Sequence, residues 1–158
     1  MLEINQAGLS WLTILKKREA FRHAFHSFDP ERVARYGARE KRRLMADAGI
    51  IRNRLKIEAT IANARTVLEL RKRHGSFAKW LDAHLFLEEH GQRSTVNGRR
   101  FRTRAEWVTL FKQTFRFTGG EIVGEFLLST GYLPGAHRES CPVYRRILTL
   151  RPAWKRTA

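Results

Sequence analysis

The residues best suited to chemistry lie near the start of the chain. Glu3 offers a carboxylate and Trp11 an indole, and the stretch Gln6-Ala7-Gly8-Leu9-Ser10 runs between them. The glycine predicts a sharp corner with Leu9 at its tip and Gln6 beside it. An apolar wedge with a polar companion can unstack a base pair and fill the gap left by an extruded nucleotide. The indole could then stack on that base, while the carboxylate accepts hydrogen bonds from an exocyclic amine.

A positive charge on the extruded base would strengthen both contacts, through ion pairing and cation–π attraction. Lys16 and Lys17 follow within two turns and could hold flanking phosphates. A structural role is the alternative for the same residues. In that interpretation Leu9 and Trp11 belong to the core, and Glu3 is a solvated charge.

A second group of residues lies in the stretch LMADAGIIRNRLKI. It predicts a helix that ends at Gly49 with a left-handed cap, a tight turn at Ile50, and a new helix that begins near Asn53. Such a helix–hairpin–helix leaves backbone N–H groups free to bind a phosphate, without sequence specificity. Positive charge would be added by Arg52, Arg54 and Lys56. An ordinary corner between two helices is the alternative.

Composition narrows the class of partner. The chain has 158 residues, which fits one domain, and its 31 Lys and Arg against 15 Asp and Glu give a formal charge of +16. This imbalance favours nucleic acid. A membrane-surface protein would need a lipidation signal or an amphipathic helix with exposed aromatic residues, and neither is evident. The single cysteine excludes a disulfide or a four-cysteine metal site within this chain and fits a reducing, cytoplasmic setting.

Apolar residues recur at helical spacing almost throughout and predict the elements that position these groups. Ser10 caps the first expected helix, whose apolar stripe is Trp11, Ile14, Leu15, Phe21, Phe25 and Phe28. Further helices are expected to begin at Pro30 and at about 38. The long helix from Asn53 is expected to bury Ile57, Ile61, Ala64, Val67 and Leu68.

The second half of the chain continues the helical pattern. Helices are expected over 76–90, after Thr103, and over 119–130, with a basic loop over 91–104 that turns at Asn97-Gly98. The remaining residues are expected to form loop and tail. Strand signals are scarce. The sequence therefore predicts an all-α fold, a single compact domain of several short helices that contains a helix–hairpin–helix motif.

Several blocks of the chain together resemble the DNA-3-methyladenine glycosylase I family, an all-helical branch of the helix–hairpin–helix DNA glycosylases. The blocks are QAGLSWLTILKKREAFRHAFHSFDPERVA, DAGIIRNRLKIEATIANA and FRFTGGEIVGEFLLSTG, and the resemblance runs from Met1 to about Cys141. It implies hydrolysis of the N-glycosidic bond of 3-methyladenine in alkylated DNA. The products would be the free base and an abasic site.

The resemblance also implies roles by motif position. Glu3 corresponds to the family's base-reading carboxylate, Trp11 to its aromatic pocket wall, Gln6–Leu9 to the element that enters the duplex, and Gly49–Lys56 to the hairpin that grips DNA. An N3-alkylated base is cationic and a good leaving group, so selective capture matters more than a strong nucleophile. No lyase step is expected, because no hairpin lysine is positioned as a Schiff-base nucleophile and Lys56 fits a phosphate contact.

This chain departs from the family pattern at the metal site. Family members usually carry a further N-terminal segment, which supplies a tyrosine facing the base and two zinc ligands. The other two ligands are a His-x-x-x-Cys pair, whose spacing His137 and Cys141 keep. Two ligands cannot close a tetrahedral site. We therefore expect no cofactor, and zinc only if such a segment supplies the missing ligands.

The sequence thus predicts an N-terminally shortened glycosylase-like domain over 1–142 and a basic tail over 143–158. The expected function is a monofunctional base-excision repair glycosylase, acting as a monomer on double-stranded DNA that contains alkylated purines. The alternative is a catalytically impaired or inactive helix–hairpin–helix DNA-binding protein. An RNA-associated protein should show aromatic platforms on a sheet or a single-strand groove, and the sequence shows neither.

Overall fold

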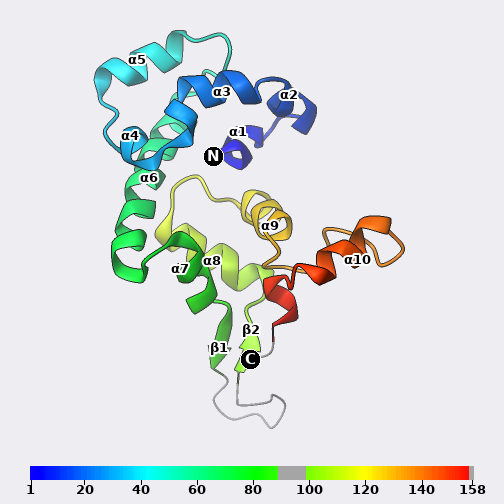
Figure 1. Cartoon of the computed structure of the whole chain (residues 1–158). Helices are drawn as coiled ribbons and strands as arrows, with labels where there is room; N and C mark the ends of the chain where they lie inside the picture. The colour runs from blue at the N-terminus through cyan, green and yellow to red at the C-terminus, as the bar shows by residue number, and fades with distance from the viewer. Residues whose placement is uncertain (89–98, 157–158) are drawn as a thin grey trace.

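The protein is mainly helical, as the sequence predicts. The structure, a computed structural model, describes residues 1–88 and 99–156 (Figure 1). Within these ranges the strands form only a two-stranded antiparallel sheet. The helices form two lobes, each with its own hydrophobic core.

The N-terminal lobe consists of short helical segments grouped at one end of the molecule (Figure 1). They are α1 (Leu2–Gln6), α2 (Trp11–Lys16), α3 (Arg18–Ala24), η1 (His26–Phe28), α4 (Pro30–Ala34) and α5 (Ala38–Ala46). Its core contains Phe21, Phe25, Val33, Tyr36, Leu44, Ile50, Ile57 and Ile61. Asp29 caps α4, and Pro30 takes the first helical position, as expected.

The long helix α6 (Arg54–His74) connects the two lobes. Asn53 caps it by accepting a hydrogen bond from Lys56 N at 3.1 Å. Ile57 and Ile61 of α6 lie in the first core, and Leu70 lies in the second. The predicted start is confirmed. The predicted buried face is confirmed at Ile57 and Ile61, whereas Ala64, Val67 and Leu68 are only half-buried.

The second lobe is built from α7 (Phe77–Ala83), α8 (Arg104–Thr114) and α9 (Gly120–Ser129), with β1 (Phe86–Glu88) and β2 (Arg99–Phe101) at its far end (Figure 1). Aromatic side chains fill its core. They are Trp80, Trp107, Phe111, Phe115 and Tyr132.

Two predicted helices are shorter than expected. The first is interrupted at Lys17, so Ile14 and Phe21 remain buried while Leu15 is exposed. The helix expected over 76–90 ends at Ala83. The chain then forms β1, because Phe86 pairs with Phe101 at a ring-centroid distance of 4.8 Å and the two strands share ladder hydrogen bonds. The turn predicted at Asn97-Gly98 lies outside the described residues.

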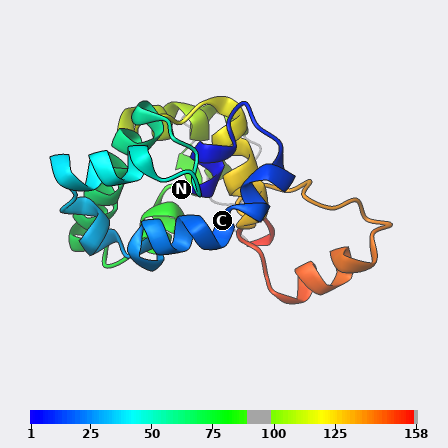
Figure 2. The ribbon, with the colours of Figure 1, turned by 90° about the horizontal axis from the view of Figure 1, so that it is seen from above.

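The segment expected as loop and tail contains a helix. α10 (Pro142–Thr149) projects from the rest of the molecule, and the η3 turn (Ala153–Lys155) returns the chain to the second lobe (Figures 1 and 2). Ala153 is buried in the second core, and the rings of Tyr144 and Trp154 stack at 6.5 Å. Pro142 at the first helical position favours the helix that the loop prediction missed.

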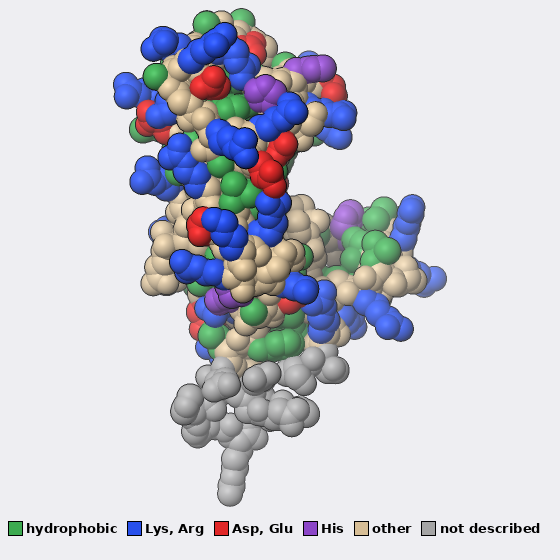
Figure 3. Space-filling view, turned by 60° about the vertical axis from the view of Figure 1, so that its left-hand side comes forward, with side chains coloured by type: hydrophobic (Ala, Val, Ile, Leu, Met, Phe, Trp, Pro, Cys, Tyr) green, Lys and Arg blue, Asp and Glu red, His purple; other side chains and the backbone are tan. Residues whose placement is uncertain are grey.

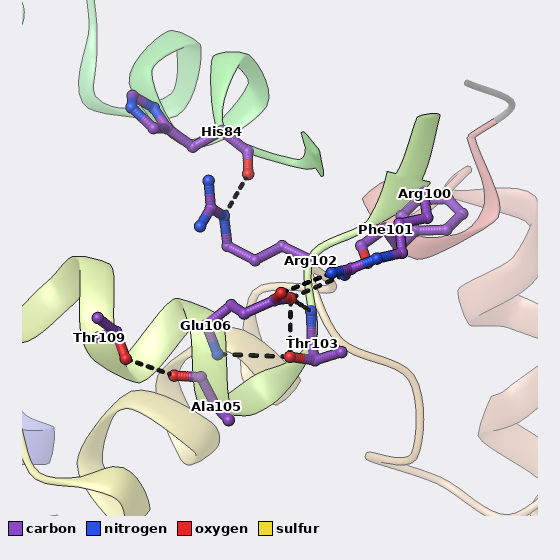
Figure 4. A network of polar contacts seen from close by, with 8 residues as sticks. All are labelled: His84, Arg100, Phe101, Arg102, Thr103, Ala105, Glu106 and Thr109. Atoms are coloured by element: carbon purple, nitrogen blue, oxygen red, sulfur yellow. Dashed lines mark hydrogen bonds and ion pairs between the residues drawn. The ribbon is translucent and has the colours of Figure 1, made fainter. Parts of the chain in front are cut away.

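A polar network fixes the start of α8 against β2 (Figure 4). Thr103 caps the helix, and Glu106 accepts hydrogen bonds from Thr103 N and Thr103 Oγ1, both at 2.8 Å. Arg100 donates two further hydrogen bonds to Glu106, at 2.9 and 2.7 Å. These bonds, with Arg100 the main cause, lower the pKa of Glu106 to about 2.

We expect Glu106→Gln to lower the free energy of unfolding at pH 7 by about 1–2 kcal/mol, because charge-assisted hydrogen bonds and a capping box are lost. The folded-state pKa lies below the ordinary value of 4.5. The stabilisation is therefore present above about pH 4.5 and is lost as the pH falls toward 2. Urea unfolding of both proteins at pH 7 and pH 2.5 measures this difference.

Glu121→Gln is the matched control, since this carboxylate pairs with Arg104 but its side chain is 88% exposed. It should change stability little at either pH. A Glu106→Gln effect of equal size at both pH values would contradict the assignment to ionised Glu106.

Candidate functional site

The corner predicted between α1 and α2 is present as a β-turn. Leu9 N donates to Gln6 O at 2.7 Å, and the Gln6 side-chain amide donates to Leu9 O at 3.0 Å. Ala7 has φ −48° and ψ 118°, and Gly8 has φ 77°. These angles define a type II turn, whose third position needs positive φ and so favours glycine. Leu9 is 38% exposed at this turn and lies outside both cores.

Glu3, on α1, contributes a carboxylate to a mainly apolar recess. The recess has a volume of about 350 Å³ and lies between α1, α4 and α6 on one side and α8 and α9 on the other. Its apolar lining includes Ile4, Phe28, Val33, Val67, Phe77, Phe111, Phe115, Ile122 and Phe126. Among the described residues that line it, Glu3 has the only ionisable side chain.

One oxygen of the Glu3 carboxylate lacks a hydrogen-bond partner among the described residues. Its Oε2 atom is buried and has no hydrogen-bond partner in the described part of the chain. Burial raises the pKa of Glu3. The positive charge of the amino group of Met1 opposes this shift, the negative charge of Glu125 adds to it, and the net direction is upward. A carboxylate in this position gains free energy from any ligand that brings hydrogen-bond donors or positive charge.

Trp11 lies in a different cavity from Glu3. With Gln6, Ala7 and Gly8 it lines a recess of about 560 Å³ against residues 119–122 and Glu125. Ile122 lines both recesses, so the two adjoin. The sequence interpretation had Glu3 and Trp11, which flank the corner in the sequence, line one pocket. In the structure Trp11 lines the recess at the corner, and Glu3 lines the adjoining one.

Phenylalanine side chains, which the sequence interpretation assigned no role at the site, form the aromatic wall beside Glu3. They come from η1, α7, α8 and α9: Phe28, Phe77, Phe111, Phe115 and Phe126. Phe28 was recognisable only as the last member of a helical stripe. Its position at the recess depends on the break in the first helix and on the η1 turn, neither of which the stripe predicts.

The connection between α5 and α6 spans residues 47–53 and corrects part of the predicted hairpin. α5 ends at Ala46, and Gly49 does not adopt positive φ, so the predicted left-handed cap is wrong. Asp47 Oδ1 accepts a hydrogen bond from Gly49 N at 2.8 Å, and a Cβ at Gly49 would lie 3.0 Å from Ala20 Cβ. Glycine is therefore favoured here by close packing against α3. Ile50, predicted to contact DNA, is buried in the first core.

Two of the predicted phosphate-contacting lysines bind the protein's own backbone. Lys17 Nζ donates to Ala48 O at 2.9 Å and to Gly49 O at 3.2 Å, which ties α2 and α3 to the hairpin. Lys56 is buried, and its Nζ donates to Asn5 O at 3.0 Å and Ala7 O at 2.7 Å. The prediction of a phosphate contact at Lys56 is wrong for this structure, because its amino group faces the inside of the protein.

The other predicted phosphate contacts remain at the surface. Lys16, Arg52 and Arg54 are exposed, and Arg54 pairs with Glu58 at 3.1 Å. Lys and Arg side chains are spread widely over the N-terminal lobe (Figure 3). The hairpin therefore presents positive charge at the start of α6, even though Lys56 does not contribute to it.

The predicted half metal site is brought together. His137 Nδ1 and Cys141 Sγ lie 3.3 Å apart just before α10. The described residues contain no group of three His, Cys, Asp or Glu side chains able to hold a metal ion. A pair alone does not fit a structural zinc site, which needs four ligands.

Within the described residues, no helix is long and apolar enough to span a membrane.

Comparison with known proteins gives a consistent family. A model of the methyladenine glycosylase family matches residues 1–145. DNA-3-methyladenine glycosylase 1 of Escherichia coli K12 is 38% identical over 147 residues, which cover 90% of this chain and 78% of that protein. The DNA-3-methyladenine glycosylase of Haemophilus influenzae is 34% identical over 145 residues, 89% of this chain and 78% of its own length.

Solved structures agree with these relatives. A variant of 3-methyladenine DNA glycosylase I from Staphylococcus aureus has a TM-score of 0.73 and 38% identity, and the match covers 89% of this chain and 77% of that one. A variant 3-methyladenine DNA glycosylase I in complex with 3-methyladenine has a TM-score of 0.73 and 36% identity, with the same coverage.

We expect Gly8→Ala to lower the free energy of unfolding by about 1 kcal/mol, because alanine disfavours the positive φ of the turn. A Cβ at Gly8 would meet nothing within 4 Å, so the cost is purely conformational. Gly120→Ala is the matched control: Gly120 is the first residue of α9, has no positive φ, and a Cβ there would lie 4.0 Å from Val108 Cγ2, so its substitution should not destabilise the protein. Urea unfolding measures both. Equal effects would show that the turn does not hold this geometry in solution.

Proposed function

The chain belongs to the methyladenine glycosylase family, and from that premise we propose that it releases 3-methyladenine from alkylated double-stranded DNA. The observation that carries the proposal is the unpartnered Glu3 carboxylate in an apolar recess of about 350 Å³. This volume lies within the range of small-molecule sites, about 300–1,000 Å³. A cationic purine would supply both the positive charge and the donors that the carboxylate lacks.

The chemistry of the glycosidic bond explains why binding the alkylated base selectively suffices for its release. Alkylation at N3 puts a positive charge on the purine, so cleavage of its bond to C1′ returns an electron pair to the base and neutralises it. Water adds its oxygen to C1′ and gives up a proton, which leaves an abasic sugar and free 3-methyladenine. Glu3 would accept hydrogen bonds from the exocyclic amine, while the phenylalanine wall excludes water from the base.

The proposal includes a route from duplex to recess. Leu9 at the type II turn would enter the base stack, with Gln6 beside it, while the target nucleotide turns outward. Trp11 lines the recess next to the corner and would contact the nucleotide on its way to the Glu3 recess. Lys16, Arg52 and Arg54 would hold phosphates, with the connection between α5 and α6 acting as the gripping hairpin.

We further propose that the enzyme is monofunctional. A lyase step would need an amine that attacks C1′, and Lys56, the lysine of the hairpin helix, uses its amino group on Asn5 O and Ala7 O. The glycosylase-like domain is taken as residues 1–142, close to the 1–145 that the family model matches.

A DNA-binding protein with impaired catalysis is the second candidate. It is favoured by the separation of Trp11 from Glu3, since the recess beside Glu3 lacks the expected indole wall. Incubation with methylated duplex DNA, followed by chromatography of the released bases, separates the two candidates. Binding without release of 3-methyladenine would favour the second.

We expect Glu3→Gln to slow release of 3-methyladenine by about 10- to 100-fold, the size of a lost charge-assisted hydrogen bond. The same change should raise the free energy of unfolding at pH 7. The folded-state pKa of Glu3 is raised, so its ionisation destabilises the fold as the pH rises past the ordinary carboxyl range, and glutamine removes that cost.

The matched control is Glu69→Gln, an exposed carboxylate on α6 that pairs with Lys72. It should leave the release rate unchanged. If Glu3→Gln released the base at the wild-type rate, Glu3 would not be the residue that reads it.

Leu9→Ala should reduce base release about tenfold or more without lowering stability, because the side chain is exposed in the free protein and is used only inside the duplex. Leu150→Ala, which removes a leucine that is 75% exposed beyond α10, is the control. Release rates and thermal unfolding are measured for each. A loss of stability with Leu9→Ala, or equal release rates for the two variants, would argue against a wedge.

A further inference from the structure

Lys56 is a buried cation whose position the proposed reaction does not by itself explain. The residue is 5% exposed, and its amino group is bonded to carbonyls about fifty positions earlier in the chain, at Asn5 (3.0 Å) and Ala7 (2.7 Å). Desolvating an ammonium group is costly, so these hydrogen bonds must compensate for it. The carbonyls concerned lie at the end of α1 and inside the corner turn.

The bond to Ala7 O selects the form of the turn. Type I and type II turns differ mainly in the orientation of the peptide between their two central residues, here Ala7 and Gly8. In the type II form the Ala7 carbonyl points the opposite way from its type I orientation, and here Lys56 holds it at 2.7 Å. Holding that peptide restrains ψ of Ala7 and φ of Gly8, the backbone angles next to Leu9. The amino group of Lys56 therefore adds to the two hydrogen bonds between Gln6 and Leu9 that hold the exposed corner.

A second contact shields this amino group from solvent. The ring of Phe117 lies 5.9 Å from Lys56 Nζ, and Phe117 has a strained φ of 57°. Asn63, on α6 like Lys56, holds the preceding residue through both backbone groups of Arg116, at 2.8 and 2.9 Å. α6 thus positions the corner through Lys56 and the aromatic cover through Asn63.

We propose that Lys56 is a positioning residue that holds the Gln6–Leu9 turn in its type II form and thereby aims Leu9 at the duplex. The inference rests on the proposed function, because it takes Leu9 as the wedge. It also links the two DNA-contacting regions. Arg52 lies just before α6, Arg54 is its first residue, and Lys56 lies in its first turn, so phosphates held there would have a fixed relation to the corner.

The test uses a duplex with 2-aminopurine next to a stable tetrahydrofuran abasic site, because 2-aminopurine fluorescence rises on unstacking. We expect Lys56→Met to lower the fluorescence gain at saturating protein about tenfold relative to wild type, and Lys56→Met should unfold as cooperatively as wild type. In the Leu9→Ala background Lys56→Met should have no further effect, because a residue that acts through Leu9 loses its role with it. If Lys56→Met does not fold, the same double-mutant cycle with Leu9→Ala is measured with Lys56→Arg instead.

The matched control is Lys16→Met, the same substitution at an exposed lysine of α2. Loss of a phosphate contact should lower the slope of log affinity against log salt by about one in Lys16→Met, whereas the slope for Lys56→Met should equal that of wild type. A reduced slope for Lys56→Met, or effects of Lys56→Met and Leu9→Ala that simply add, would overturn the proposal.

The readouts are separate from catalysis. If wild type opens this duplex but releases no 3-methyladenine from methylated DNA, the proposed activity fails and the comparison of variants still decides the role of Lys56. If wild type binds the duplex without raising fluorescence, the role of Lys56 as an aid to the wedge is overturned, whatever the release assay shows.

Discussion

The site exists because one helix belongs to two hydrophobic cores. α6 contributes Ile57 and Ile61 to the first core and Leu70 to the second, so the two lobes are held apart along its length. The recess beside Glu3 lies where they face each other, and α6 lines it between the two cores. The same helix carries Arg54 at its start and Lys56 in its first turn. A change in its packing would therefore alter the recess, the hairpin and the corner together.

Electrostatics at the site depend on what is left unpaired. The amino groups of Lys56 and Lys17 donate hydrogen bonds to backbone carbonyls, and the Glu106 carboxylate accepts hydrogen bonds from Arg100 and Thr103. Glu3, in contrast, keeps a buried oxygen without a partner. An unsatisfied buried carboxylate lowers stability, and natural sites tolerate that cost where a ligand relieves it. The contrast distinguishes these paired groups from Glu3, the carboxylate that we propose reads the substrate.

Local patterns in the sequence were sufficient for several helix starts and for the corner, because caps and glycine positions act over a few residues. They did not predict the break at Lys17, the end of α7 at Ala83 or the helix α10. Asn53, Thr103 and Gly8 each hold the role that their neighbours predict. Contacts between distant segments were not predictable in the same way. Nothing near Lys56 indicates that its amino group meets Ala7, and the hairpin pattern favoured a phosphate instead. The roles predicted for Glu3, Trp11 and the surface cations concern a bound duplex and stay predictions.

A protein with a formal charge of +16 would repel a free cationic base, yet the proposed substrate is a cationic base. The difficulty disappears because the base arrives attached to a polyanion. In the proposed complex, Lys and Arg side chains on the N-terminal lobe would attract the phosphates over about a Debye length, roughly 10 Å at 0.1 M salt. Selection then occurs at contact distance, where Glu3 is the sole ionisable side chain among the described residues of the recess. In the proposed reaction the purine would be neutral once the glycosidic bond is broken and that attraction would end, so the carboxylate that favours capture would not hold the product.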